Sequence, residues 1–215
     1  MNINFDLCKP NRKVGEFMII DQGGGTYYHF NEFLLNKLKQ YNESSIVVEV
    51  GVFGGASLLD LHTIINNPKC KLYGIDKWHT QNSMNGIFKD KWDKNDWDKY
   101  INIQKQNYDT LNEVINKYNY NITLIKLEDT GLTDNAAHHF QDNSIDFIHI
   151  DGDHSYIAVT SDLESYFPKI KKNGIMWFDD WKWPETKKAI TEFSEKHNLD
   201  INVINENKCY VIVPS

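Results

Sequence analysis

Carboxylate side chains and a histidine follow two apolar segments of this sequence. In DFIHIDGDHSY, Asp151, Asp153 and His154 come directly after a mostly apolar run, and GIMWFDD ends on Asp179 and Asp180. Carboxylates gathered at one place raise each other's pKa unless something positive lies among them. A hard divalent cation such as Mg²⁺ relieves that repulsion and takes oxygen ligands, and a histidine beside it can act as a general base near neutral pH. The pattern predicts a metal site; the alternative is that these carboxylates cap helices and face water.

A glycine-rich turn follows an earlier apolar run, in EVGVFGGAS at residues 49–57. Gly51, Gly54 and Gly55 allow positive φ and close approach of the backbone to a ligand, and the helix expected next offers free N–H groups. The spacing is G-x-x-G-G and not the G-x-G-x-x-G of dinucleotide-binding folds, which disfavours an NAD-dependent oxidoreductase. Ser57 suits the N-cap of that helix and a ligand contact equally well.

Further acidic residues follow the next two apolar runs. Asp76 ends KLYGID, where a carboxylate can accept hydrogen bonds from both hydroxyls of a ribose; a plain turn aspartate is the alternative. Glu128 and Asp129 follow ITLIKL and suit the edge of an adenine. With the glycine turn, these positions are compatible with a nucleoside-containing cofactor.

The apolar periodicity alternates between strands and helices. Short runs rich in β-branched residues predict strands at 46–52, 71–76, 122–127, 144–151, 174–180, 201–205 and 208–214. Helical patterns lie between them at 58–65, about 108–118, 133–140, 158–167 and 185–197. A Lys-Asn-Gly turn precedes the fifth strand, and a two-residue Glu-Asn turn joins the last two, which must therefore be antiparallel. We expect an α/β, Rossmann-like, seven-stranded sheet, mostly parallel with an antiparallel last strand and helices on both faces. Ligands bind at the carboxyl ends of such strands.

The chain divides into two expected parts. Residues 1–43 are expected to form an N-terminal arm with cap helices, and residues 44–215 to form one domain. The polar segment 77–107 is predicted to be an irregular, lid-like insert within that domain. Its mixed charges would also suit a dimer contact.

Length and composition exclude several classes of protein. The 215 residues carry 30 acidic and 23 basic side chains, for a formal net charge of −7 at pH 7, so nucleic acid is not an expected partner. No apolar run reaches the ~18 residues of a membrane span, and the first residues lack the apolar stretch of a secretory signal. The three cysteines lie far apart and indicate neither a disulfide framework nor a thiolate metal site. We expect a cytoplasmic protein, with a homodimer left open.

Four segments together resemble the class I S-adenosylmethionine-dependent methyltransferases: VVEVGVFGGASLL, GIDKW, DFIHIDGDHSY and NGIMWFDDW, in that order. Within this class they are similar to the macrocin- and cephalosporin-biosynthesis-type O-methyltransferases, and more distantly to catechol O-methyltransferase. The resemblance covers roughly residues 44–214. Catechol-type enzymes differ from this chain in two respects: they carry Asp-Asn in place of Asp179-Asp180, and they lack a histidine at the position of His154.

The resemblance implies a role for each of the residues singled out above. The cofactor S-adenosylmethionine would be held by Glu49, Gly51, Gly54, Gly55, Ser57, Asp76, Glu128, Asp129 and Asp153. Mg²⁺ or another divalent cation would be held by Asp151, Asp179 and Asp180. His154 would act as the catalytic base, with Asp151 as the second catalytic residue.

The implied reaction transfers a methyl group from S-adenosylmethionine to a hydroxyl. Tyr156, Trp78 and Trp181 are candidates for lining the substrate site, and flat aromatic faces suit sugar rings and aromatic rings equally. The resemblance favours a sugar hydroxyl in a glycan or glycosylated metabolite. The alternatives are a phenolic or catechol-like acceptor, and a scaffold that binds the cofactor without turnover.

Overall fold

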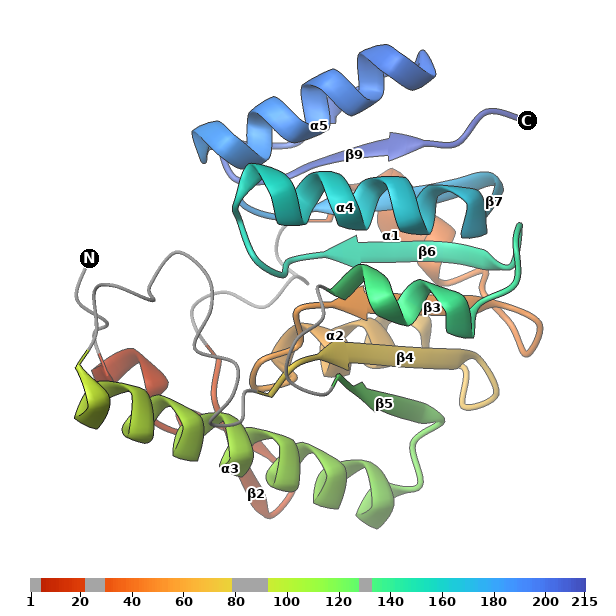
Figure 1. Cartoon of the computed structure of the whole chain (residues 1–215). Coiled ribbons are helices and arrows are strands. Elements are labelled where there is room, and N and C mark those ends of the chain that lie inside the picture. The colour runs from red at the N-terminus through yellow and green to blue at the C-terminus, as the bar shows by residue number, and fades with distance from the viewer. Residues whose placement is uncertain (1–4, 22–29, 79–92, 128–132) are drawn as a thin grey trace.

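The computed structural model of the chain describes residues 5–21, 30–78, 93–127 and 133–215. Its centre is a sheet of seven strands: β3 (Ile46–Val50), β4 (Lys71–Asp76), β5 (Ile122–Lys126), β6 (Ile145–Ile150), β7 (Ile170–Phe178), β8 (Asn202–Val203) and β9 (Cys209–Ile212). Their order across the sheet is β5-β4-β3-β6-β7-β9-β8 (Figure 1). All neighbours from β5 to β7 are parallel, and β9 runs antiparallel to both β7 and β8. The predicted seven-stranded plan is confirmed.

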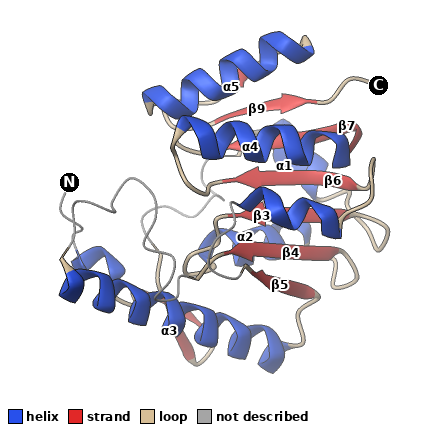
Figure 2. Ribbon diagram, viewed as in Figure 1, coloured by secondary structure: helices blue, strands red, loops and turns tan. Residues whose placement is uncertain are grey.

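Helices cover both faces of this sheet (Figure 2). They are α1 (Glu32–Leu38), α2 (Ala56–Ile65), α3 (Lys94–Tyr118), α4 (Tyr156–Tyr166) and α5 (Pro184–His197), with the 3-10 helices η1 (Phe5–Cys8), η3 (Thr133–His139) and η4 (Phe167–Lys169). Helices α1, α2 and α3 contribute Leu34, Leu58 and Leu111 to the core on one face. Helices α4 and α5 contribute Leu163 and Ile190 to the core on the other. Because both faces are covered, the central strands read as continuous apolar runs.

Helix α3 begins at Lys94, much earlier than the predicted start near residue 108. The Asp93 side chain caps it by accepting a hydrogen bond from the Asp96 N–H at 3.0 Å. Its buried stripe includes Gln104 and Asn107, and these polar residues interrupt the apolar periodicity on which the prediction relied. The expectation of an irregular segment is therefore wrong for residues 94–107, while residues 79–92 lie outside the described part. Across the described ranges, α3 included, no helix is both long and apolar enough to cross a membrane.

Two smaller features also differ from the predictions. Strand β7 begins at Ile170, so the expected Lys-Asn-Gly turn lies inside the strand, where the register against β6 shifts. Asn173 there has a φ of +61°, a conformation that asparagine tolerates better than most residues. The N-terminal part contains, besides η1 and α1, an unpredicted antiparallel hairpin of β1 (Arg12–Val14) and β2 (Phe17–Ile19). These three-residue strands are too short to produce a clear alternating pattern.

Candidate active site

The turn after β3 brings two strand ends into close contact. Gly51 has a φ of +88° and donates its N–H to the Ile75 carbonyl at 2.9 Å. A Cβ at Gly51 would lie 2.0 Å from the Asp151 carbonyl oxygen. Gly55 has a φ of +83° and is the N-cap of α2. Only glycine therefore allows the β3 and β6 ends to approach this closely at position 51.

Asp76, at the end of β4, lies beside this turn. One of its carboxylate oxygens accepts a hydrogen bond from the Phe53 N–H at 2.7 Å, and the other accepts one from the Trp78 N–H at 3.0 Å. These two bonds hold the carboxylate in place. Each carboxylate oxygen can accept more than one hydrogen bond, so Asp76 retains acceptor capacity for a ligand hydroxyl.

Two carboxylates and a histidine meet where β6 and β7 end. Asp151, His154 and Asp180 each offer a ligand atom, and these atoms all lie within 4.8 Å of one another. The His154 Nε2 is 3.2 Å from the Asp180 Oδ2. Asp180 has a φ of +55° and donates its N–H to the Asp179 Oδ1 at 2.9 Å. We call Asp151, His154 and Asp180 the open cluster.

A second, deeper group adjoins the open cluster through Asp151. His149 is fully buried, with Nδ1 3.8 Å from the Glu49 Oε2 and Nε2 3.8 Å from the Asp179 Oδ2. Neither ring nitrogen has a hydrogen-bond partner in the described structure. The Lys208 ammonium forms an ion pair with the Asp179 Oδ2. We call Glu49, His149, Asp179 and Lys208 the inner cluster.

Burial dominates the electrostatics of both clusters. It raises the pKa of Asp151 to about 7; His149 and Lys208 lower that pKa, whereas Asp180 and Glu49 raise it. Burial also lowers the pKa of Lys208, an effect that the negative charges of Asp151 and Glu49 oppose. A carboxyl with a pKa near neutrality can take up or release a proton at physiological pH, which is typical of functional sites.

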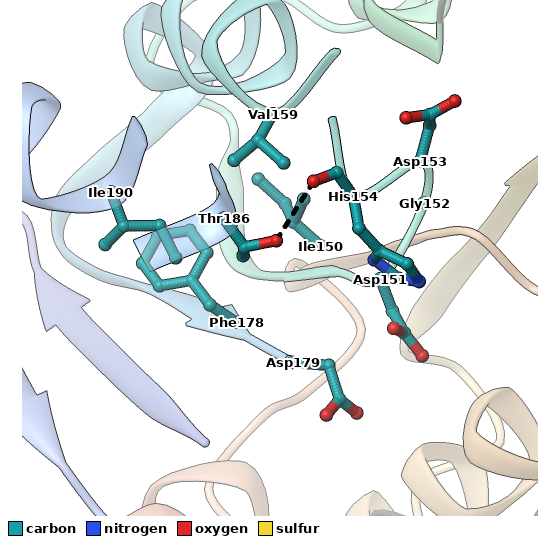
Figure 3. Close-up of a pocket in the computed structure, with 10 residues that line it drawn as sticks. All are labelled: Ile150, Asp151, Gly152, Asp153, His154, Val159, Phe178, Asp179, Thr186 and Ile190. Atoms are coloured by element: carbon teal, nitrogen blue, oxygen red, sulfur yellow. Dashed lines mark hydrogen bonds between the residues drawn. The ribbon is translucent and has the colours of Figure 1, made fainter. Parts of the chain in front are cut away.

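A small pocket lies behind the open cluster (Figure 3). Val159, Phe178 and Ile190 form its apolar side, and Asp151 and Asp179 lie on its polar side. The figure shows the His154 ring close to Asp151, with the Asp153 carboxylate pointing away from the other two carboxylates. The Thr186 hydroxyl donates a hydrogen bond to the His154 carbonyl at 3.3 Å. This bond ties the turn that carries His154 to α5.

Residues 48–181 match the family model described as a methyltransferase domain. This match covers more than half of the chain. The chain belongs to the methyltransferase domain family. An uncharacterised protein of Acanthamoeba polyphaga mimivirus is 28% identical over 171 residues, which is 77% of this chain and 66% of the relative. The chain thus spans slightly less than two thirds of that relative's length.

Solved structures share the fold of this methyltransferase domain. The O-methyltransferase NovP is 16% identical, with a TM-score of 0.54 over 85% of this chain and 80% of that chain. CalS11, a TDP-rhamnose 3'-O-methyltransferase of calicheamicin biosynthesis, is 13% identical, with a TM-score of 0.53 over 84% of this chain and 76% of that chain. The S-adenosylhomocysteine-bound PaMTH1 of Podospora anserina is 12% identical, with a TM-score of 0.54 over 85% and 77%. At these identities the similarity establishes the fold alone.

The structure places most of the predicted cofactor residues of the methyltransferase domain at one edge of the sheet. Glu49 is fully buried, and the hydroxyl of the half-buried Ser57 donates a hydrogen bond to it. The N-cap of α2 is Gly55 and not Ser57. Asp153 accepts a hydrogen bond from the Ser155 N–H at 2.8 Å. Glu128 and Asp129 lie outside the described residues.

The three predicted substrate residues all make contacts within the protein. Trp78 is fully buried and donates its indole N–H to the Phe53 carbonyl at 2.9 Å. Trp181 is 9% exposed and belongs to the core beneath α5. The Tyr156 hydroxyl donates to the Glu192 carboxylate at 2.6 Å, so this side chain faces α5. We singled out these rings because they follow strand ends in the sequence. That position carries no information about their contacts with neighbouring elements.

Two residues of the site were missed, His149 and Lys208, which both belong to the inner cluster. The half-buried Trp183 also lies at the site, with its ring 5.0 Å from the His154 ring. Strand register contained a signal for the first two: Glu49 pairs with His149, His149 with Trp177, and Trp177 with Tyr210. Lys208 precedes Tyr210 by two residues, hence it lies on the same face, at the end where β6 and β7 finish. The observable signal was therefore the presence of polar residues, such as Glu49 and His149, in otherwise apolar strands.

Proposed function

We propose that this chain transfers a methyl group from S-adenosylmethionine to a sugar hydroxyl, in a glycan or glycosylated metabolite, with the help of a divalent cation. The observation that carries the proposal is the open cluster, Asp151, His154 and Asp180, beside the glycine turn that follows β3. Membership of the methyltransferase domain family supports the transferase part. The finer kinship, with macrocin- and cephalosporin-biosynthesis-type enzymes, is part of the proposal.

The cofactor would lie over the ends of β3 and β4. The backbone of the turn from Gly51 to Gly55 would hold its methionine part, and Asp76 its ribose. The geometry of Asp76 fits this role, because two backbone N–H groups fix the carboxylate while it keeps acceptor capacity. Asp76 is also only partly buried, which leaves it accessible to a ligand.

The donor set of the two clusters fits a hard divalent cation. Asp151, Asp179 and Asp180 supply carboxylate oxygens, the ligands that Mg²⁺ prefers. The raised pKa of Asp151 indicates a carboxylate whose charge the protein alone balances incompletely, and the ring nitrogens of the fully buried His149 lack hydrogen-bond partners within the described residues. A bound cation would act as a Lewis acid toward the acceptor hydroxyl.

His154 is the residue placed to remove the proton from that hydroxyl. Its Nε2 lies at the open cluster, and the pairing with Asp180 at 3.2 Å stabilises the imidazolium that proton uptake would produce. Without a bound cation, burial raises the pKa of Asp151 to about 7, so this carboxyl is partly protonated at neutral pH, and a cation at the site would favour its charged form. Alignment of hydroxyl and methyl donor can contribute about 7–11 kcal/mol, more than the base does.

The choice of a sugar rests on two observations. Trp183 presents an aromatic ring next to His154, and such rings pack against the apolar faces of sugars as well as against phenols. Among the proteins that share the fold, CalS11 is named as a TDP-rhamnose 3'-O-methyltransferase. The phenolic acceptor and the non-catalytic scaffold are the outcomes that the following test must separate.

The test combines binding and turnover on the whole chain. Calorimetry should show saturable binding of S-adenosylmethionine and none of NAD. S-Adenosylhomocysteine, detected by mass spectrometry, should form with nucleotide sugars or glycosides and Mg²⁺, and its formation should stop with EDTA. Asp180→Asn should lose turnover and keep cofactor binding, whereas the exposed control Asp200→Asn should keep both.

Each part of the proposal can fail separately. Methylation of a catechol but of no sugar would refute the acceptor class. Turnover that survives EDTA would refute the role of the cation. Binding of the cofactor without turnover on any acceptor class would favour the scaffold, and binding of NAD in place of S-adenosylmethionine would refute the transferase.

A further inference from the structure

Lys208 is a buried cation inside an otherwise acidic site. The residue is 7% exposed and directly precedes β9, the antiparallel strand that closes the sheet. Because β9 runs against β7, its beginning lies at the edge where the parallel strands end. The ammonium contacts the Asp179 Oδ2. Buried lysines are rare unless they are paired. The pairing with Asp179 is therefore what allows the Lys208 ammonium to be buried at this site.

The contacts of Asp179 differ from those of the other two carboxylates. Its Oδ1 accepts the Asp180 N–H at 2.9 Å, and its Oδ2 takes the Lys208 ammonium. The Asp151 carboxylate receives no hydrogen bond from the described part of the chain. Both oxygens of Asp179 are thus engaged within the protein, while Asp151 remains available to a cation.

We propose that Lys208 is the resident counter-ion of Asp179 and competes with a divalent cation for that carboxylate. The inference rests on the cation that the proposed function includes. It concerns Lys208 as a residue that positions Asp179 and sets the affinity of the site. It does not make Lys208 a catalytic residue.

Competition follows from charge and from space. A cation that binds Asp179 shares this carboxylate with the ammonium or displaces it from the Oδ2, and in both cases the ammonium's charge stays near the site because the lysine stem is buried. Like charges held close together in a poorly solvated region repel strongly. The same ammonium balances Asp179 before any ion binds, so the protein can fold with these carboxylates enclosed. The cost is weaker ion binding.

Methionine at position 208 removes the charge and keeps a similar unbranched stem. Coupling energies between close charge pairs at buried sites correspond to affinity changes of roughly tenfold or more. Lys208→Met should therefore bind Mn²⁺, used as the probe, at least about tenfold more tightly than the native chain. The gain should require Asp179, so Lys208→Met should change the Mn²⁺ affinity much less in the Asp179→Asn background than in the native chain.

The experiment measures Mn²⁺ binding by electron paramagnetic resonance and calorimetry on the full chain. A suitable control is Lys187→Met, which removes an exposed ammonium lying 5.0 Å from the Trp181 ring and outside both clusters. This variant should bind Mn²⁺ as the native chain does, which separates the direct contact from a general change of net charge. Circular dichroism checks that each variant folds.

A second measurement uses the native chain and does not depend on a variant that folds. The ¹⁵N resonance of the Lys208 ammonium should shift when Mg²⁺ is added, because the ion displaces it from Asp179. The ammonium resonance of Lys187 should not shift. An unchanged Lys208 resonance at saturating Mg²⁺ would overturn the inference.

The outcomes distinguish this inference from the proposed function. Equal or weaker Mn²⁺ affinity in folded Lys208→Met refutes the competition and leaves the cation site standing. Absence of Mn²⁺ binding in every variant refutes the cation and, with it, the role of Lys208. S-Adenosylmethionine binding, measured on the same samples, reports independently on the transferase part.

Discussion

The imidazole of His154 and the carboxylate of Asp180 join the two turns that end β6 and β7, with Nε2 and Oδ2 3.2 Å apart. The two residues follow different strands and are far apart in the sequence. Asp151 completes this group, with its ligand atom within 4.8 Å of the other two. The contact puts a proton acceptor directly beside the carboxylates that would hold a cation.

Replacement of His154 should slow turnover without removing the cofactor site. Removal of a general base typically costs ~10²–10⁴-fold in rate, so we expect a fall of this size in kcat for His154→Ala. Loss of a cation ligand affects both charge and alignment, hence Asp179→Ala should lower kcat further. Steady-state kinetics with S-adenosylmethionine binding as the control measure both effects. An unchanged kcat in His154→Ala would show that another group takes the proton.

Gly51 should not tolerate a side chain. In Gly51→Ala the new Cβ would collide with the backbone of Asp151, and the φ of +88° is strained for alanine. We expect a loss of at least about 2 kcal/mol in the free energy of unfolding, measured by urea denaturation. Gly74→Ala in β4 is the matched control: its Cβ meets the flexible end of the Leu58 side chain, so its cost should be smaller. A larger loss in the control would contradict this account of the turn.

Asp151 should make the cation-free protein less stable as the pH rises. Its pKa is about 7 in the folded protein, against an ordinary value of 3.8. Between pH 3.8 and about 7 the folded state holds a proton that the unfolded state has lost. The contribution of Asp151 to the free energy of unfolding therefore falls as the pH rises through this range. Above about 7 the contribution is constant.

Thermal unfolding between pH 4 and pH 8 in EDTA tests this sign. The Asp151→Asn variant should lack that part of the pH dependence, because asparagine does not titrate. Mg²⁺ at pH 8 should stabilise the native chain more than the variant. Identical pH profiles for both proteins would show that Asp151 titrates normally.

Arg12 should hold the N-terminal hairpin against α2. Its guanidinium pairs with both carboxylate oxygens of Asp60 and lies 3.4 Å from the Asp21 carboxylate. The hydrogen bonds to Asp60 raise the pKa of Arg12. Since the arginine side chain is 31% exposed, its removal in Arg12→Met should cost only about 1 kcal/mol of unfolding free energy. Arg12→Lys should recover part of the loss, as a lysine cannot form the paired contact, and a neutral result for Arg12→Met would rule out the hairpin anchor.

Much of this architecture was readable from local patterns. The run Ile46–Val50 and the alternation of strands and helices sufficed for the seven-stranded plan, since a buried parallel strand has a distinctive sequence. The predicted two-residue turn is wrong in length, because β8 ends at Val203 and β9 begins at Cys209. The same patterns placed Asp151, Asp179 and Asp180 at one edge, because parallel strands end together. The first half of helix α3 was not predicted, because the polar residues Gln104 and Asn107 lie on its buried face.

Sequence alone determined that Asp151, His154, Asp179 and Asp180 reach that edge, since their positions follow from strand ends. Only the tertiary structure decided how these groups share charge. Lys208 reaches Asp179 from a strand about 30 residues later in the chain, and Trp78 turns inward under Tyr108. Such contacts depend on which side chains fill the space between elements, and local periodicity carries no information about partners that are distant in the chain.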